Sequence, residues 1–352
     1  MIFMSENRNR EYTAAELRGI ISGKKRAGRV PDIVHFWAYP PSFERNESAA
    51  RKVLAAYPCD AKRLDIMMPQ AVIAPPDDPN FVWLKNSSGK LGTSYDNSVY
   101  ISDEDFGNGM ERIAAGFDGI AGYKGIFGAA GKLGFEDAKG PDAYRLGALW
   151  YMFFERHWSL RGMQNAMTDF YDYPESVSGF YAALADLYCK IILRAKNELG
   201  IHGMLISDDI GAQAAPMFNE EIFKKFFKPN YKKVIDFCHS IGIEFWLHSC
   251  GNIEPFIPHF IELKLDVLHP IQKYTMDQRA IAKKYGDKIC IWAGFDVQRV
   301  LPFGTSDDVR NEVREMREIY KGSRWMFTLG NGATPDIPID NLEALLDEVT
   351  KN

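Results

Sequence analysis

Short apolar runs alternate with longer segments of helical periodicity from about residue 175 to the C-terminus. The apolar runs predict strands at 203–207, 244–248, 266–268, 289–294 and 325–329. The segments between them predict helices at 174–199, 219–241, 276–285, 306–320 and 340–349, with a short helix after Glu254. Strands that are apolar throughout and separated by helices are typical of a buried parallel sheet.

The first half adds three apolar runs, at 33–36, 63–67 and 146–152, to the five of the second half. Parallel strands in this number, with helices between them, predict an α/β fold of the (β/α)8 TIM-barrel type with one domain over residues 1–352. A doubly wound sheet is the structural alternative. Residues 78–103 break the pattern and predict an antiparallel ribbon inserted near the barrel mouth. The glycine-rich stretch 107–140 predicts a loop with a short helix.

Polar side chains follow most of the predicted strands at their C-terminal ends, and this favours the barrel. In a barrel these ends share one mouth, so the side chains would converge there. The residues concerned are Asp208, Asp209, His248, Cys250, His269, Gln272, Asp296 and Asn331.

His248 and Cys250 lie within the segment FWLHSCGN at 245–252, where the predicted strand ends. One intervening residue puts both side chains on the same side of an extended backbone. An imidazole and a thiolate that point together form half of a tetrahedral zinc site. The alternative interpretation is that Cys250 is a small buried hydrophobe.

Two adjacent acids, Asp208 and Asp209, end the strand 203–207 and are candidate catalytic residues. They could bind a substrate hydroxyl, a cation or a metal, or Asp209 could only stabilise the following loop. Asn331 lies between two glycines after the strand 325–329. It could hydrogen-bond a substrate, or adopt a left-handed turn conformation.

Residues near the predicted mouth are candidates for substrate binding. Trp37 and Tyr39 are two of several aromatic residues there that could line a pocket for a flat ligand. Gln272 and Asp296 are at strand ends, and Glu155 is a possible oxygen ligand or acid–base group. A basic-aromatic cluster beside Glu155 could hold an anion or form a solvated helix face: Arg156, His157, Trp158 and Arg161.

Composition excludes several classes of protein. The net charge of -5 and the lack of a long Lys/Arg run argue against nucleic-acid binding. No stretch reaches the roughly 18 uninterrupted apolar residues of a membrane span, and residues 1–10 lack the apolar core of a signal peptide. Five scattered cysteines indicate reduced thiols and a cytoplasmic location.

The second half resembles the uroporphyrinogen decarboxylase superfamily over residues 175–350. The motifs that carry the resemblance are DDIG at 208–211 followed by FNEEIF at 218–223, HSCGN at 248–252, DVLHPIQ at 266–272, and LGNG at 329–332 followed by Pro335, Pro338 and Asn341. Decarboxylases of this superfamily act on uroporphyrinogen without a cofactor and carry an arginine-rich N-terminal motif. Residues 33–41 read IVHFWAYPP instead, and Asn331 replaces their closing histidine.

The other branch implied by the resemblance comprises corrinoid-linked methyltransferases. These bind zinc through His-x-Cys and a cysteine in the closing loop, and the zinc activates an acceptor thiol. His248 and Cys250 fit this pattern, whereas the closing cysteine corresponds to Asn331. The third ligand would then be Glu155, Asp208, Asp209 or Cys290.

The leading hypothesis is therefore a zinc-dependent methyltransferase that moves a methyl group between a corrinoid protein and a thiol or other acceptor. Cobalamin would be carried by that partner protein, and the resemblance implies a possible homodimer. The first alternative is cofactor-free decarboxylation of uroporphyrinogen or a related polycarboxylate, with Asp208 or Asp209 binding pyrrole N–H groups. The second is a non-catalytic barrel that binds a corrinoid or tetrapyrrole.

Overall fold

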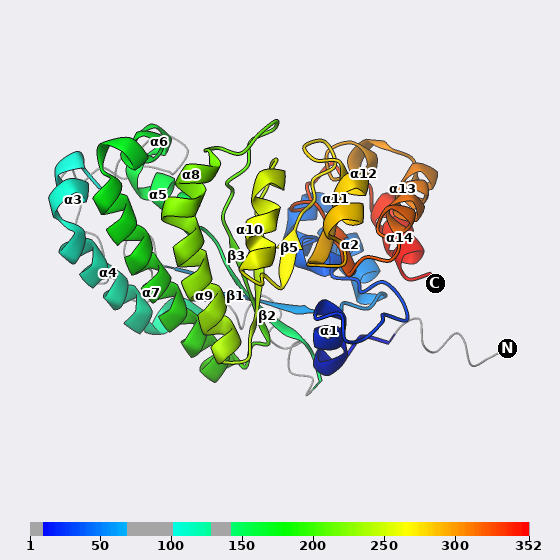
Figure 1. Ribbon diagram of the computed structural model, residues 1–352. Coiled ribbons are helices and arrows are strands. Elements are labelled where there is room, and N and C mark those ends of the chain that lie inside the picture. The colour runs from blue at the N-terminus through cyan, green and yellow to red at the C-terminus, as the bar shows by residue number, and fades with distance from the viewer. Residues whose placement is uncertain (1–9, 69–100, 128–141, 352) are drawn as a thin grey trace.

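Seven parallel strands form the single sheet of a computed structural model, which describes residues 10–68, 101–127 and 142–351. Neighbouring strands in the sheet follow one another in the chain (Figure 1). They are β1 (Lys62–Asp65), β2 (Arg145–Leu149), β3 (Gly203–Ser207), β4 (Glu244–His248), β5 (Val267–His269), β6 (Cys290–Phe295) and β7 (Trp325–Leu329). The sequential order with helical crossovers establishes an α/β fold.

Helices lie along the outside of the sheet, with α4, α7 and α9 at one end and α11, α13 and α14 at the other (Figure 1). The α-helices of the first half are α1 (Ala14–Ile21), α2 (Glu47–Ala55), α3 (Asp103–Asn108), α4 (Met110–Gly122), α5 (Phe154–Arg161), α6 (Met163–Asp172) and α7 (Pro174–Leu199). Those of the second half are α8 (Glu220–Ile222), α9 (Lys228–Ser240), α10 (Ile257–Glu262), α11 (Gln278–Tyr285), α12 (Val300–Phe303), α13 (Ser306–Ile319) and α14 (Ile339–Val349). Short 3-10 helices are η1 (Val34–Phe36), η2 (Pro40–Asn46), η3 (Lys124–Phe127) and η6 (Glu254–Phe256).

Local sequence signals explain where several of these elements begin and end. Helix α7 begins at Pro174, whose fixed φ suits a first helical turn, and ends at Gly200 with φ +63°. Helix α13 begins with a capping box, in which Thr305 and Asp308 each satisfy a backbone N–H of the other. Every residue of β3 and of β6 is buried, as expected for central strands covered on both faces.

The predicted strand at 33–36 is wrong, because Val34–Phe36 form the 3-10 helix η1. The chain is extended only just before it, where Asp32 forms an isolated parallel bridge with Phe327 of β7. The Phe327 N–H donates to the Pro31 carbonyl (2.8 Å), and the Asp60 N–H donates to the Asp32 carbonyl (2.9 Å). Residues 31–33 thus connect β7 to the segment that leads into β1.

Two other predictions of the sequence need correction or fall outside the described residues. Within 107–140, the helix that was predicted as a short one is α4, at Met110–Gly122. The predicted helix 219–241 is divided into α8, a π-helical segment at Phe223–Phe227 and α9. The predicted ribbon at 78–103 lies almost entirely within residues 69–100, outside the described residues.

Among the described residues, α7 alone is long and apolar enough to cross a membrane by length and composition. Half of its most apolar window is buried inside the protein. Its inward face includes Phe180, Tyr188 and Ile192, none of which is exposed. Packing in the protein core therefore accounts for its apolar composition.

Candidate metal centre

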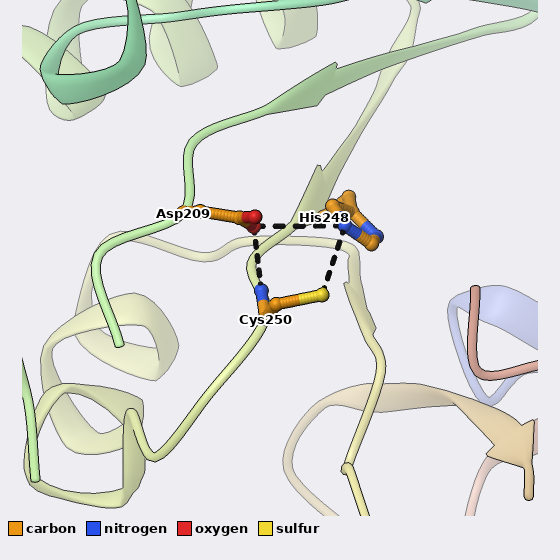
Figure 2. Close-up of side chains that lie close together, drawn as sticks. All are labelled: Asp209, His248 and Cys250. Atoms are coloured by element: carbon orange, nitrogen blue, oxygen red, sulfur yellow. Dashed lines mark hydrogen bonds and ion pairs between the residues drawn. The ribbon is translucent and has the colours of Figure 1, made fainter. Parts of the chain in front are cut away.

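Three potential metal ligands meet at the C-terminal ends of β3 and β4 (Figure 2). Asp209 follows β3, His248 is the last residue of β4, and Cys250 lies on the loop beyond it. His248 Nε2 is 3.4 Å from Cys250 Sγ and 3.6 Å from Asp209 Oδ1. One ligand atom from each residue lies within 4.8 Å of the other two, so one ion could contact all three.

The loop after β4 is held tightly against the loop after β3. The Cys250 N–H donates to Asp209 Oδ1 (2.7 Å), and the Gly251 N–H donates to Gln272 Oε1 (3.0 Å). Gly251 has φ +83°, and a Cβ on it would be 2.3 Å from the backbone of Gly211. The two glycines are required here because no side chain fits between the two backbones.

The donor set fits a zinc ion. With the bond lengths usual for zinc, atoms that share a tetrahedral ion lie about 3.3–3.6 Å apart. The separations from His248 Nε2 to the sulfur and to the carboxylate oxygen, 3.4 and 3.6 Å, are of this size. One nitrogen, one sulfur and one oxygen leave a fourth position for another ligand, as in catalytic zinc sites.

Burial determines the protonation of these groups before any metal binds. It lowers the pKa of His248, so the imidazole is neutral at pH 7, and the Asp209 charge opposes this only in part. Burial raises the pKa of the Cys250 thiol, and the charges of Asp209 and Glu155 raise it further. A metal that binds here would therefore displace a proton from Cys250.

Glu155 lies beside the cluster but is not one of the three converging groups. Its side chain is buried and accepts a hydrogen bond from Ser207 Oγ (2.6 Å). Burial raises its pKa well above the usual value, and the charges of Asp209 and Asp208 add to this effect. These surroundings disfavour the charged form of the Glu155 carboxyl.

Asp208 points away from this cluster into the protein. It is 0% exposed, and its carboxylate accepts hydrogen bonds from Tyr231 Oη (2.7 Å) and from the N–H groups of Phe153 and Glu155. Burial raises its pKa to about 7, while these hydrogen bonds lower it. Its position explains how the start of α5, and with it Glu155, is fixed against β3.

The two aromatic residues predicted to bind substrate, Trp37 and Tyr39, lie in different parts of the structure. Trp37 is buried against the cluster, with ring centroids 4.9 Å from those of both His248 and His269. Tyr39 is 41% exposed and lines a different cavity of about 920 Å³, together with Lys62 and Arg63. None of the three candidate metal ligands lines that cavity.

Of the strand-end residues Asn331, Gln272 and Asp296, the first two reach the cluster and the third does not. Asn331 Nδ2 is 3.7 Å from Cys250 Sγ, and Gln272 holds Gly251 as described above. Asp296 instead accepts hydrogen bonds from Tyr274 Oη (2.7 Å) and from backbone N–H groups of its own loop, including that of Gln298. It shapes the loop after β6.

The basic-aromatic cluster is not a solvated helix face. On α5, the side chains of Arg156, His157 and Arg161 are buried. Arg161 makes an ion pair with Asp169 (2.8 Å), and His157 Nε2 is 2.9 Å from the same carboxylate. The Arg161 charge is thus paired inside the protein, where its contact with Asp169 joins α5 to α6.

One residue beside the cluster has no role assigned from the sequence. His269 ends β5 and lies directly opposite His248 in the parallel pairing of β4 and β5. Its Nδ1 is 2.7 Å from His248 Nδ1. The sequence signal is that both strands end in a histidine; the contact itself depends on the register between the strands.

The geometry defines an α/β protein with a candidate metal site at the C-terminal ends of its parallel strands. The family model for uroporphyrinogen decarboxylase matches residues 157–352, and the chain belongs to this family. No curated protein sequence matches the chain.

Among solved structures, a methyltransferase from Methanosarcina mazei is similar to this chain with a TM-score of 0.59 and 15% identity, covering 96% of this chain and 98% of that one. At this identity the similarity establishes a shared fold. A weaker match, with a TM-score of 0.42 and 12% identity, is a B12-independent methionine synthase from a Shewanella species; it covers 61% of this chain and 65% of that one. A putative vitamin-B12-independent methionine synthase from Listeria monocytogenes matches with a TM-score of 0.39 and 16% identity, over 61% and 68% of the two chains.

Proposed function

We propose that this protein is a zinc-dependent methyltransferase that moves a methyl group between a corrinoid protein and a thiol or other acceptor. The observation that carries the proposal is the convergence of Asp209, His248 and Cys250. In this proposal Asp209 provides the third ligand, which the sequence resemblance left open.

We also propose that the fold is the predicted barrel, in which residues 31–33 serve as the eighth strand, beside β7.

The ligand charges suit zinc, and the position of Asp209 selects it among the candidates for the third ligand. A thiolate, a carboxylate and a neutral imidazole together carry two negative charges, which balance a divalent zinc ion. Zinc held there would lower the pKa of an acceptor thiol bound to it, so that the thiolate nucleophile forms at neutral pH. The Asp209 side chain is 40% exposed, compared with 6% for His248, so the site is open to a substrate on that side.

Neighbouring residues would orient the site and limit access of water. Trp37 covers one face of the His248 ring, and Trp150 contacts the same ring edge-on with centroids 6.4 Å apart. Burial disfavours the charged form of Glu155, whereas Asp209 is one of the three converging groups. Asn331 lies close enough to Cys250 Sγ to donate a weak hydrogen bond to it, which would stabilise the thiolate.

Decarboxylation of a porphyrinogen has less support. That alternative needs a carboxylate that can accept hydrogen bonds from pyrrole N–H groups of a substrate. The oxygens of Asp208 are enclosed and already accept from Tyr231 and two backbone N–H groups. Asp209 is accessible, but its side chain converges with His248 and Cys250 in the candidate metal site.

The partner and its setting follow from this proposal. Cobalamin would be bound by a separate corrinoid protein that approaches the mouth beside Asp209. A homodimer and a cytoplasmic location remain part of the same hypothesis.

A direct test is to supply methylcobalamin and a small thiol to the zinc-loaded protein and measure the methyl thioether formed. No product above the rate without protein would contradict the proposal.

Replacing Asp209 by asparagine is expected to weaken zinc binding by about 100-fold or more. This loss of affinity exceeds the one usual for a residue that supports a metal ligand without binding the metal itself. Asparagine keeps an oxygen that can accept the Cys250 N–H, so the loop stays in place while the charged ligand is lost. Competition with a chromogenic chelator measures the affinity.

Asp296→Asn is the matched control for Asp209→Asn. Asp296 also follows a strand, and asparagine can still accept hydrogen bonds from its loop. We expect this variant to bind zinc with the affinity of the wild-type protein. Equal affinities for both variants would remove Asp209 from the proposed ligand set.

A further inference from the structure

His269 is fully buried behind the candidate metal centre and is not a member of it. It is 0% exposed, and each of its two ring nitrogens has a partner. Nε2 is 3.0 Å from the Leu329 carbonyl of β7, and Nδ1 is 2.7 Å from His248 Nδ1. Two imidazoles and one carbonyl therefore form a continuous hydrogen-bonded chain from β7 to β4.

The carbonyl at one end of this chain determines which atom donates and which accepts in each hydrogen bond. A carbonyl oxygen can only accept, so His269 must carry a proton on Nε2. His269 is 0% exposed and neither of its two partners is an acid, so a neutral ring with its single proton on Nε2 satisfies both contacts and leaves Nδ1 as an acceptor. His248 must then donate from Nδ1, which leaves the lone pair of the neutral His248 ring on Nε2.

That lone pair faces the other two potential ligands. His248 Nε2 is the atom that lies 3.4 Å from Cys250 Sγ and 3.6 Å from Asp209 Oδ1. The opposite tautomer of His248 would place two bare Nδ1 atoms against each other at 2.7 Å. It would also point an N–H at the position of the ion, where a lone pair is needed.

Packing holds both rings in this arrangement. Trp37 stacks on His269 with an interplanar angle of 12° and centroids 4.9 Å apart, and Trp292 covers His269 at 4.5 Å. The strand register aligns His248 with His269, and Leu329 lies on β7, which is not a neighbour of β4 or β5 in the sheet. The orientation of the rings is therefore determined by three separate strands.

We propose that His269 is a positioning residue that fixes the Nδ1–H tautomer of His248 and so presents the Nε2 lone pair to the metal. The part that concerns metal affinity rests on the proposed zinc site, but the tautomer is a property of the metal-free protein. Histidine ligands are usually oriented by a carboxylate, a backbone carbonyl or water. Here the ligand His248 is oriented by a second imidazole, that of His269. The Leu329 carbonyl in turn fixes the position of the proton on His269.

Two substitutions separate positioning from simple packing. His269→Phe fills the space but offers no acceptor to His248 Nδ1. His269→Asn leaves a cavity, but its side-chain oxygen can lie where Nδ1 was and accept the same proton. A packing role predicts the larger defect for asparagine, whereas the positioning role predicts the larger defect for phenylalanine.

The tautomer is read by nitrogen-15 NMR of the metal-free protein, with His248 assigned by its absence in His248→Gln. We expect protonated Nδ1 and bare Nε2 in the wild-type protein and in His269→Asn, and a mixture of tautomers in His269→Phe. Zinc affinity should fall by about 10- to 100-fold in His269→Phe and recover in His269→Asn. Thermal unfolding of the three proteins gives the packing contribution separately.

Two results would overturn this inference: a wild-type His248 protonated on Nε2, or a His269→Phe variant with unchanged tautomer and zinc affinity. A different pattern would overturn the proposed function alone. If the wild-type protein binds no zinc but His248 is protonated on Nδ1, the zinc site is lost and the hydrogen-bonded chain is supported.

Discussion

Cys250→Ala is expected to reduce bound zinc from about one equivalent to less than a tenth of an equivalent. The substitution removes the only thiolate of the site and leaves one nitrogen and one oxygen ligand. The side chain is only partly buried, so alanine should cost less than about 1 kcal/mol of folding stability. Zinc content measured by mass spectrometry, together with thermal unfolding, checks both parts.

Cys189→Ala is the matched control for this experiment. Cys189 is also a free cysteine of intermediate burial, but it lies on α7 and not at a strand end. Its removal should leave zinc content unchanged. Full zinc occupancy in Cys250→Ala, or equal loss in the two variants, would contradict the assignment of Cys250 as a ligand.

Gly251→Ala is expected to destabilise the protein by about 2–4 kcal/mol and to abolish zinc binding. The new Cβ would lie 2.3 Å from the carbonyl carbon and oxygen of Gly211, and these backbone atoms cannot rotate away. Relief of the clash must move the loop that carries Cys250 away from Asp209. Chemical denaturation and zinc content measure the two effects.

The control for Gly251→Ala is Gly242→Ala. Gly242 has a similar backbone conformation, with φ +75°, but no atom would lie within 4 Å of the added Cβ. This variant should lose only about 1–2 kcal/mol, the cost of a left-handed conformation, and should keep its zinc. Similar losses of stability in both variants would show that backbone conformation, not the contact with Gly211, explains the effect.

The second half of the fold was predictable because its strands are long, uniformly apolar and separated by helices with clear ends. The predicted bounds of β3, β4, β7 and α7 agree with the structure to the residue. The prediction of a strand at 33–36 failed because a run of four residues, three of them apolar, does not distinguish a strand from a helical turn. Helix α4 is longer than the short helix predicted within 107–140, because its internal glycines favour a loop, yet Ile113 and Ile120 are buried in the core.

The candidate site was predictable in part. The position at a strand end, and the alternation of side chains along an extended backbone, were sufficient to select His248 and Cys250. Asp209 was among four candidates for a third ligand. Only the close approach of the loops at Gly211 and Gly251 brings Asp209, and not Asp208, Glu155 or Cys290, to the pair. His269 could not be assigned a role, because its effect depends on ring orientation and hydrogen-bond direction.

The most direct test of the central claim is X-ray absorption at the zinc edge on protein purified without chelators. The proposed site predicts about one zinc per chain, with one sulfur at about 2.3 Å and nitrogen or oxygen ligands at about 2.0–2.2 Å. Less than about a tenth of an equivalent of zinc, or a shell without sulfur, would contradict the assignment of Asp209, His248 and Cys250 as a metal centre.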